Sequence, residues 1–245
     1  MRSLIFKSLT HHFKWSFPPN DWVLSEDEVH VWVANLNQPD AEYKRLAQTL
    51  SSDEQERAAR FQFRQDRMNF IAARGLLRKI LGGYAKVLPK ELQFSYGQNG
   101  KPRLVSSSNL PLSFNLSHSG GLALYAISAN RDLGIDLERV SNFSDMDDIA
   151  ARCFLPEEQS ALQFLQPQQK AENFFRYWTR KEAQLKCSGQ GFSSEPENEL
   201  RFTGTLLELD PAEGFIAALA VCGRPFQLRM WQWQGEPNSE RVAGT

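Results

Sequence analysis

The hydrophobic period of this chain changes from helical to strand-like, and the same change occurs a second time. Apolar residues recur at helical spacing over residues 39–84 and again over residues 146–188. Alternation typical of strands precedes the first helical stretch, at residues 29–34, and follows both of them. The strands predicted after the helices are residues 92–96, 114–118, 122–128 and 133–140, and then residues 201–209, 214–221 and 226–233. This order predicts an α+β fold made of two similar halves.

The expected boundary between the halves lies near residues 130–133, where a polar turn separates two strand-like segments. The prediction divides the chain into an N-terminal α+β half, residues 1–131, and a C-terminal α+β half, residues 132–245. Turns rich in Gly, Asn and Pro separate the strand segments between residues 92 and 140. This spacing predicts an antiparallel meander there.

Charge and cysteine content narrow the function classes. The formal net charge is −1, so no global electrostatic field attracts nucleic acid or a membrane surface. The three cysteines form no C-x-x-C pair, which argues against a disulfide framework or a thiolate zinc site and fits a reducing compartment. No apolar run approaches the ~18 residues of a membrane-spanning helix, and the N-terminus does not fit a signal peptide. We therefore expect a cytoplasmic protein that binds neither nucleic acid nor membranes.

Two acidic residues, Asp136 and Glu138, lie two positions apart in the segment GIDLERV. Successive strand residues face opposite sides, so both carboxylates share one face of the predicted strand. Like charges on one face repel each other unless a cation lies between them, and carboxylate oxygens suit Mg²⁺ or Mn²⁺. This pair alone favours a solvated strand face, with a metal site as the alternative.

A third acid, Glu182, lies in the predicted helix FFRYWTRKEAQLK, one turn before Lys186. At this spacing the two side chains are neighbours on the helix surface. They form either an ordinary surface ion pair or a carboxylate and a cation that face a phosphate. Spacing alone leaves both interpretations open.

Candidate phosphate ligands occur in turns and on helices. Lys101 follows a Gly turn, and Ser117 and His118 end a predicted strand where side chains and backbone N–H groups can bind an anion. His118 taken alone is more typical of a structural histidine. The helices of the first half carry further candidate cations, Arg57, Arg64, Arg67 and Arg74. Most such arginines are solvated, and we expect one or two at most to contact a ligand. The sequence contains no P-loop, no dinucleotide-binding glycine motif and no nucleophile elbow.

Three ordered blocks resemble the surfactin-synthetase-type 4′-phosphopantetheinyl transferases. They are FNLSHSGG at residues 114–121, GIDLE at 134–138 and WTRKEAQLK at 178–186. The cyanobacterial members look most similar, because FIAARGLLRKILGGY and the N-G-K-P turn also match. The resemblance runs from about Ser51 to Phe192, which is more than half of the chain.

The resemblance implies a pseudo-twofold monomer of two similar α+β halves, with the active site in the cleft between them. It also implies a Mg²⁺-dependent enzyme, with Mn²⁺ as a possible substitute. Such a holo-[acyl-carrier-protein] synthase transfers the 4′-phosphopantetheine arm of coenzyme A to a serine hydroxyl of an apo acyl, polyketide or peptidyl carrier protein. The other product is 3′,5′-ADP. Fatty acid synthesis and secondary metabolism are the pathways that use such carriers.

Carried over by position, the resemblance gives roles to the candidate residues. Asp136, Glu138 and Glu182 match the metal-binding acids, and Glu182 also matches the residue that takes the serine proton, with Lys186 as the cation beside it. The positions that match contacts to coenzyme A are Arg57, Arg74, Lys101, Ser117 and His118. One neighbouring basic position of the family is an acid here, Glu54, which departs from the pattern.

The family docks its acidic, helical carrier proteins on the segment after the D-x-E strand. In this chain that segment offers three apolar anchors and a cation: Phe143, Met146, Phe154 and Arg152. An amphipathic helix that packs on the core would show the same residues. Two other functions stay open for the chain. One is a metal-dependent phosphodiesterase or nuclease, and the other is a non-catalytic module of the same fold that binds carrier proteins.

Overall fold

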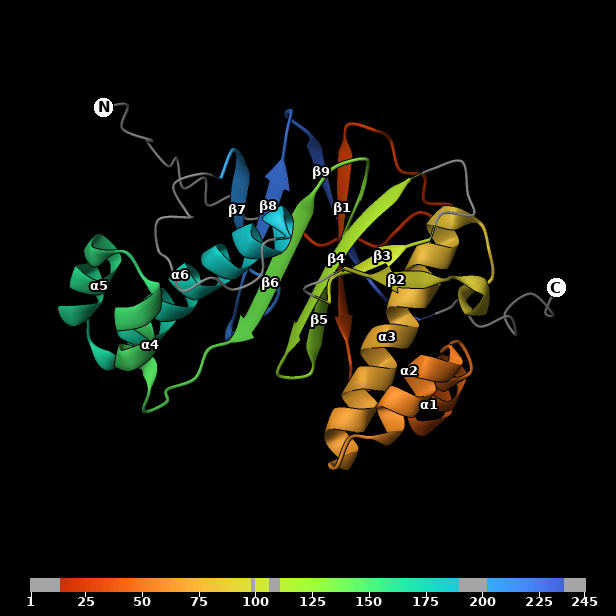
Figure 1. Cartoon of the computed structure of the whole chain (residues 1–245), viewed down its shortest axis with the longest axis horizontal. Helices are drawn as coiled ribbons and strands as arrows, with labels where there is room; N and C mark the ends of the chain where they lie inside the picture. The colour runs from red at the N-terminus through yellow and green to blue at the C-terminus, as the bar shows by residue number, and fades with distance from the viewer. Residues whose placement is uncertain (1–13, 98–99, 106–110, 190–201, 236–245) are drawn as a thin grey trace.

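The computed structural model describes residues 14–97, 100–105, 111–189 and 202–235, and it repeats one order of elements. In the first half a strand and three helices come first: β1 (Glu28–Asn35), α1 (Asp40–Ala47), α2 (Ser52–Ala59) and α3 (Arg64–Ala85). A 3₁₀ turn η1 (Pro89–Glu91) and a short hairpin of β2 (Phe94–Tyr96) and β3 (Pro102–Leu104) follow. Two long strands, β4 (Leu112–Ser119) and β5 (Leu122–Ala129), complete it (Figure 1).

Within the described residues, the second half has the same order without a counterpart of η1 and the β2–β3 hairpin. Its strand and helices are β6 (Leu133–Arg139), α4 (Met146–Cys153), α5 (Pro156–Gln163) and α6 (Pro167–Ser188), and its two strands are β7 (Gly204–Leu209) and β8 (Phe215–Cys222). One further strand, β9 (Gln227–Gln232), follows. The sheet orders also correspond, since β4-β5-β1 matches β7-β8-β6. The α+β class and the repeated plan predicted from the sequence are therefore confirmed.

The halves share a strand across the proposed division at residues 131 and 132. Strand β9 pairs in parallel with β1 and extends the first sheet to the order β4-β5-β1-β9. The other ladders of the two larger sheets are antiparallel. The start of the strand predicted at residue 201 lies outside the described residues.

The predicted antiparallel meander is wrong in two respects. Strand β6 pairs with β8 rather than with its sequence neighbour β5. The physical reason is that β5 has no free edge, because β4 and β1 occupy its two sides. The sequence analysis also missed β3, which has only three residues and pairs with β2 as a separate hairpin.

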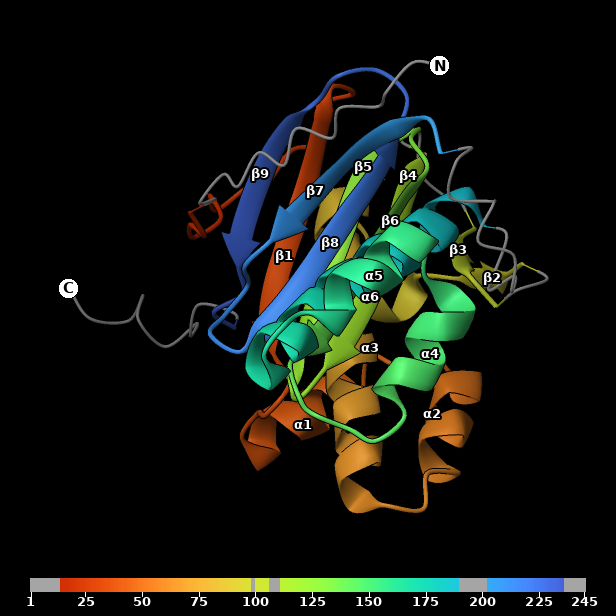
Figure 2. The same ribbon diagram turned by 90° about the vertical axis from the view of Figure 1, so that its left-hand side faces the viewer.

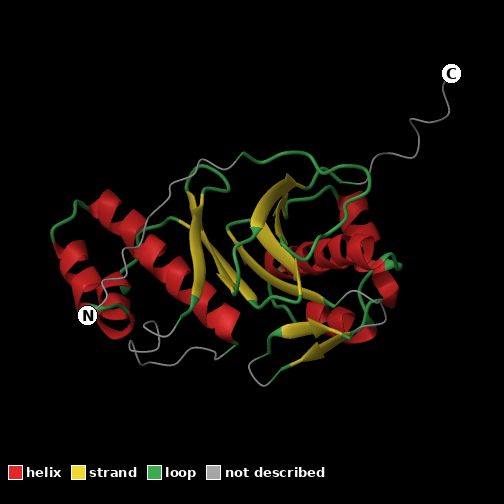
Figure 3. Ribbon diagram, turned by 90° about the horizontal axis from the view of Figure 1, so that it is seen from above, coloured by secondary structure: helices red, strands yellow, loops and turns green. Residues whose placement is uncertain are grey.

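The two larger sheets pack face to face, with helices outside each. In β1, Val29, Val31 and Val33 face the second sheet, while Trp32 and Ala34 face a core shared with α3. This alternation follows from the two-residue period of a strand. Figures 2 and 3 show α6 lying across β6 and β8 and the helices of the two halves on opposite sides of the strands.

The same alternation in β6 separates residues that pack between the sheets from residues that face α6. Leu133, Ile135 and Leu137 pack between the sheets. The residues between them therefore face α6, among them Gly134 and Asp136. A Cβ at position 134 would overlap the carbonyl oxygen of Ala183 and the backbone nitrogen of Cys187. Only glycine therefore permits this close approach of helix α6 and strand β6.

Candidate functional site

The site is centred on Asp136, whose side chain is buried at the contact between β4, β6 and α6. Its Oδ1 accepts hydrogen bonds from Lys186 Nζ at 2.6 Å and from Ser117 Oγ at 2.9 Å. Its Oδ2 is buried, and in the described part of the chain it has no hydrogen-bond partner. A buried carboxylate oxygen without a partner is costly, so this atom is poised for a ligand.

Strands β4 and β6 are joined here by side chains rather than by a backbone ladder. Asn115 Oδ1 accepts a hydrogen bond from the backbone N–H of Ile135 at 2.8 Å, and Ser119 Oγ donates to Glu138 Oε2 at 2.8 Å. With the bond between Ser117 and Asp136, these contacts place the motif NLSHS alongside GIDLE. The sequence pattern predicts no role for Asn115, and for Ser119 only a place in a turn that could bind an anion, although both share the two-residue period of Ser117.

The other two acids, Glu138 and Glu182, flank Asp136 and resist ionisation. Burial raises the pKa of Glu138, and the charges of Asp136 and Glu182 raise it further, against the hydrogen bond from Ser119. Burial likewise raises the pKa of Glu182, followed by the charge of Asp136, while Lys186 opposes both effects. The three carboxylates therefore repel each other in the absence of added positive charge, as strand alternation predicted for the first two.

Lys186 pairs across the structure rather than along its helix. Besides its bond to Asp136, Nζ donates to Ile135 O and to Ser117 Oγ, each at 3.3 Å. The structure thus brings together Asp136, Glu138, Glu182, Lys186 and Ser117 from three elements. The alternative of an isolated surface ion pair between Glu182 and Lys186 does not describe this contact.

The carboxylate oxygens of this cluster are of the type that binds a hard divalent cation, although they are not gathered into a complete coordination shell. Among the described residues no group of three acidic, His or Cys side chains is gathered closely enough to hold a metal ion. Carboxylate oxygens are nevertheless the ligands that Mg²⁺ and Mn²⁺ prefer. Three carboxylates beside one ammonium leave net negative charge, and Asp136 Oδ2 supplies an oxygen without a partner. These residues therefore fit a divalent cation in charge and in donor type.

Lys101 lies next to this cluster and fastens the hairpin tip to the second half. Its Nζ donates to Lys186 O at 2.6 Å and to Leu133 O at 3.1 Å. Burial lowers the pKa of Lys101. The ammonium also lines a pocket with Arg103, Ser113 and Asp132. The structure thus places Lys101 at the rim of the candidate site.

His118 sits between the two serines of β4, so its ring projects to the other face of the strand. The residue is exposed at the surface. Partial burial of the ring and the nearby charge of Lys186 lower the pKa of His118. The charge of Lys186 therefore acts on His118, although in the described residues His118 shares no hydrogen bond with the cluster.

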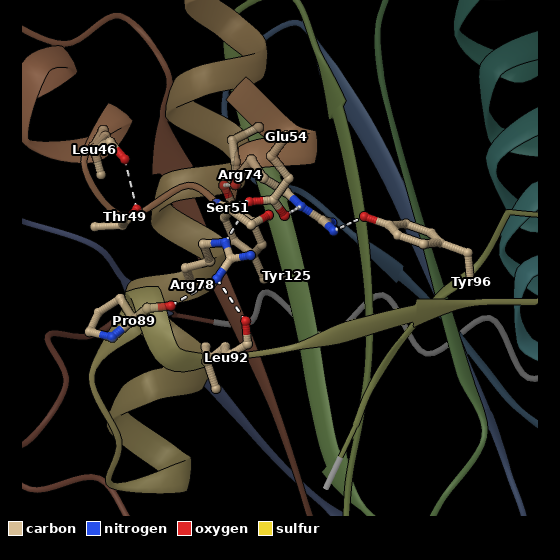
Figure 4. A network of polar contacts seen from close by, with 11 residues as sticks. Leu46, Thr49, Ser51, Glu54, Arg74, Arg78, Pro89, Leu92, Tyr96 and Tyr125 are labelled. Carbon is tan, nitrogen blue, oxygen red and sulfur yellow. Dashed lines mark hydrogen bonds and ion pairs between the residues drawn. The ribbon is translucent and has the colours of Figure 1, made fainter. Parts of the chain in front are cut away.

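The two arginines that match coenzyme A contacts, Arg57 and Arg74, have their described contacts with residues outside the cluster of Asp136, Glu138 and Glu182. Arg57 is exposed, with its guanidinium 5.3 Å from the ring centroid of Phe70. Arg74 is buried inside the first half, where it pairs with Glu54 and donates from Nη2 to Tyr96 Oη at 2.5 Å (Figure 4). The structure does not bring Arg74 to the candidate site. Its ion pair with Glu54 explains why position 54 is acidic, and the contact to coenzyme A stays a prediction.

The predicted docking residues divide into two groups. Met146 and Phe154 are 6% and 1% exposed and belong to the core beneath α4, so they do not form a docking surface as predicted. The amphipathic helix α4 turns these apolar residues inward. Phe143 is exposed and packs edge-on against Phe174, and Arg152 is exposed, with Nε donating to Asp148 O.

Comparison with known proteins gives matches along nearly the whole chain. The family model described as 4′-phosphopantetheinyl transferase superfamily matches residues 132–243, and the one described as 4′-phosphopantetheinyl transferase, N-terminal, matches residues 36–130. The 4′-phosphopantetheinyl transferase HetI of Nostoc sp. is 45% identical over 229 residues, which are 88% of this chain and 96% of that protein.

Two further relatives agree over a shorter length. A putative 4′-phosphopantetheinyl transferase of Synechocystis sp. is 38% identical over 144 residues, which are 59% of this chain and 58% of that protein. The 4′-phosphopantetheinyl transferase of Bacillus subtilis is 30% identical over 152 residues, 62% of this chain and 66% of that protein. In the described residues, no helix has an apolar stretch long enough to span a bilayer.

Proposed function

This chain belongs to the 4′-phosphopantetheinyl transferase superfamily, and on that premise we propose that it transfers the 4′-phosphopantetheine arm of coenzyme A to a serine of an apo carrier protein. The second product is 3′,5′-ADP. The observation that carries this proposal is the buried, half-satisfied carboxylate of Asp136 between two further acids and a lysine.

Asp136, Glu138 and Glu182 are the residues that would hold Mg²⁺, or Mn²⁺ in its place. A bound ion supplies positive charge beside the pyrophosphate of coenzyme A. The chain contributes the geometry, since Ser117 and Ser119 orient Asp136 and Glu138 through the hydrogen bonds described above. Such support from neighbouring groups fixes how a carboxylate meets its ligand.

Bond making and breaking occur at one phosphorus atom. The serine oxygen of the carrier protein attacks the phosphorus that bears the pantetheine arm, and the bond from this phosphorus to the oxygen of 3′,5′-ADP breaks. Glu182 accepts the serine proton, directly or through water. The ammonium of Lys186, which already faces Asp136, stabilises the negative charge on the departing phosphate.

Contacts to coenzyme A come from the first half and from the cleft in this proposal. Lys101 and Ser117 lie beside the acidic cluster, with His118 on the neighbouring face of β4. Arg57 is the exposed cation that reaches toward a phosphate, and Arg74 stays a predicted contact although it pairs with Glu54.

The partner is an acidic carrier protein of the acyl, polyketide or peptidyl class. Of the four residues predicted to dock it, Phe143 and Arg152 keep exposed side chains and stay in the proposal. The full set of acids lies in one chain, so the enzyme acts as a monomer, with its halves divided at residues 131 and 132. A cytoplasmic location is part of the same proposal.

The test is a direct transfer assay. The purified chain, coenzyme A, Mg²⁺ and an apo carrier protein are mixed, and the carrier is weighed by mass spectrometry. We expect a mass gain of one phosphopantetheine group, abolished by Glu182→Gln but not by Glu172→Gln, a matched change earlier on the same helix. No gain on any carrier of the three classes would refute the proposal, and hydrolysis of coenzyme A without a carrier would point to a phosphodiesterase.

A further inference from the structure

Two cysteines far apart in the sequence meet at the end of α6. Cys187 lies in the last turn of α6, and Cys222 is the last residue of β8. Both are free thiols, and their Sγ atoms are 3.1 Å apart. The active-site chemistry proposed above uses neither of them. The third cysteine, Cys153, is buried in another core.

We propose that Cys187 and Cys222 form a reversible disulfide that ties the end of α6 to β8 and slows the transfer reaction. The sulfur atoms of a disulfide are about 2.0 Å apart, so the two sulfurs need to approach by about 1 Å. The helix already rests directly on the strands at this point, because Gly134 lets the backbone of Cys187 approach β6. No large rearrangement is required to close the bond.

The two thiols differ in solvent exposure, and this difference determines which of them is oxidised first. Cys187 is 2% exposed and packs among Ala183, Ala218 and Ala220. Cys222 is partly exposed and lines a surface pocket with Arg131 and Arg224. Burial, together with the adjacent Cys222, raises the pKa of Cys187, which keeps it a thiol at neutral pH. An oxidant from solution therefore meets Cys222 first.

The chemistry balances with a peroxide as oxidant. The thiolate of Cys222 attacks one oxygen of hydrogen peroxide, giving a sulfenic acid on Cys222 and hydroxide, which takes up a proton to become water. The sulfur of Cys187 then attacks the sulfenic sulfur, the S–S bond forms, and a second water leaves. A dithiol reductant returns both thiols.

The bond would act on the proposed active site through its neighbours in sequence. Cys187 directly follows Lys186, whose Nζ holds Asp136 and whose carbonyl oxygen accepts from Lys101. The thiol of Cys187 also donates to Asp132 O at 3.3 Å, and the disulfide removes this donor. This functional effect rests on the transferase activity proposed above, whereas formation of the bond does not.

The bond itself is tested on the full chain by counting thiols. The protein is treated with hydrogen peroxide, denatured, alkylated and weighed. We expect one alkylated cysteine after oxidation and three after reduction, and Cys153→Ser should leave bond formation intact. Retention of all three thiols, or over-oxidation of Cys222 beside a free Cys187, would overturn the proposal. This readout stands even if no transfer is observed.

The regulatory effect is tested with the same samples. A displacement of about 1 Å near reacting groups can cost up to about 100-fold in rate, so we expect oxidation to slow transfer by about tenfold or more. Dithiothreitol should restore the rate, and Cys222→Ser should be insensitive to peroxide. A complete disulfide with an unchanged rate would contradict the regulatory role while leaving the bond in place.

Discussion

Two buried carboxylates, Glu54 in the first half and Asp136 in the second, meet cations in opposite ways. Both oxygens of Glu54 are bonded, Oε1 by Arg74 Nε and Oε2 by Arg78 Nε at 2.6 Å. Asp136 has one oxygen bonded to Lys186 and Ser117, and its second oxygen is left without a partner. The first centre is closed by the chain, and the second is open to a ligand.

Their electrostatics differ in the same sense. Burial alone would raise the pKa of Glu54, but hydrogen bonds and charges from Arg78 and Arg74 outweigh it and hold the pKa below its usual range. At the other centre burial and mutual repulsion raise the pKa of Glu138 and of Glu182. Excess positive charge therefore surrounds Glu54, whereas the acids around Asp136 lack it. The contrast separates an acid that holds the fold together from acids available for chemistry.

The residues around Glu54 also help to position the hairpin that reaches the site around Asp136. Arg78 Nη1 donates to Pro89 O and Leu92 O at 2.9 and 3.0 Å, and Arg74 lies over the ring of Phe94. These contacts, of which Figure 4 draws those of Arg78, hold the segment that leads into the hairpin β2–β3. Lys101 lies between the two strands of this hairpin. The hairpin is thus held by arginines at its base and by Lys101 at the candidate site.

The largest effect on activity is expected for Asp136→Asn. We expect the transfer rate to fall by about 1,000-fold or more, because the site loses the charge that binds the ion and opposes Lys186. The free energy of unfolding should change by less than about 2 kcal/mol, since the amide oxygen still accepts hydrogen bonds. Carrier mass spectrometry and urea unfolding measure the two quantities. A variant that keeps its rate would remove Asp136 from the active site.

The reciprocal change, Glu54→Gln, should act on stability. Two arginines then lose their buried counter-charge, which costs about 3–5 kcal/mol in the free energy of unfolding. The rate per folded molecule should fall by much less than in Asp136→Asn. Urea unfolding and transfer assays at a temperature where the variant is folded provide the check. A loss below about 1 kcal/mol would show that the closed centre does not stabilise the fold.

The two centres should also respond to pH with opposite sign. The lowered pKa of Glu54 means that its stabilisation is present above the unfolded-state pKa and is lost as pH falls through the folded-state pKa. The raised pKa of Glu182 means that its favourable protonated form is present below the unfolded-state pKa and is lost as pH rises through the folded-state pKa.

Over a range from about pH 3 to pH 7, we therefore expect Glu182→Gln to gain stability relative to the wild type as the pH rises above about 4.3. The stability deficit of Glu54→Gln should be constant above about pH 4.3 and should shrink as the pH falls below it. Unfolding free energies measured in buffer with a chelator, across this range, test the prediction. Parallel curves for the two variants would show that the centres do not differ in charge balance.

The smallest effect is expected for Tyr96→Phe. The change removes the hydrogen bond from Arg74 Nη2, but Tyr96 is 46% exposed, so water can replace the hydroxyl. The cost should be about 0.5–1.5 kcal/mol in the free energy of unfolding. Thermal or urea unfolding is sufficient to measure it. A larger loss would mean that the hairpin depends on this single bond.

Much of the fold could be predicted from local patterns. The strands that carry Ser117 and Asp136, and the helix that carries Glu182, lie where period and turn residues predicted them. Alternation also predicted that Asp136 and Glu138 share a face, and the structure confirms it, since both accept hydrogen bonds from serines two positions apart on β4. These are properties of the backbone repeat, which residues within one element determine.

The partners of these residues could not be predicted in the same way. Helical spacing paired Lys186 with Glu182, but the structure pairs it with Asp136. Sequence position likewise left Arg74 as a ligand contact and Phe154 as a surface anchor, and both are buried. Each of these outcomes depends on which distant element covers the side chain.

By itself, the sequence determined where the longer helices and strands form, which face of β6 is acidic, and to which family the three motifs belong. Only the tertiary structure decided that β6 leaves its sequence neighbour for β8, that Gly134 brings α6 against it, and that Asp136 keeps one oxygen unbonded. The physical reason is the sequence separation over which each kind of interaction acts. Periodicity follows from geometry within a few residues, whereas burial and charge pairing depend on contacts between segments far apart in the chain.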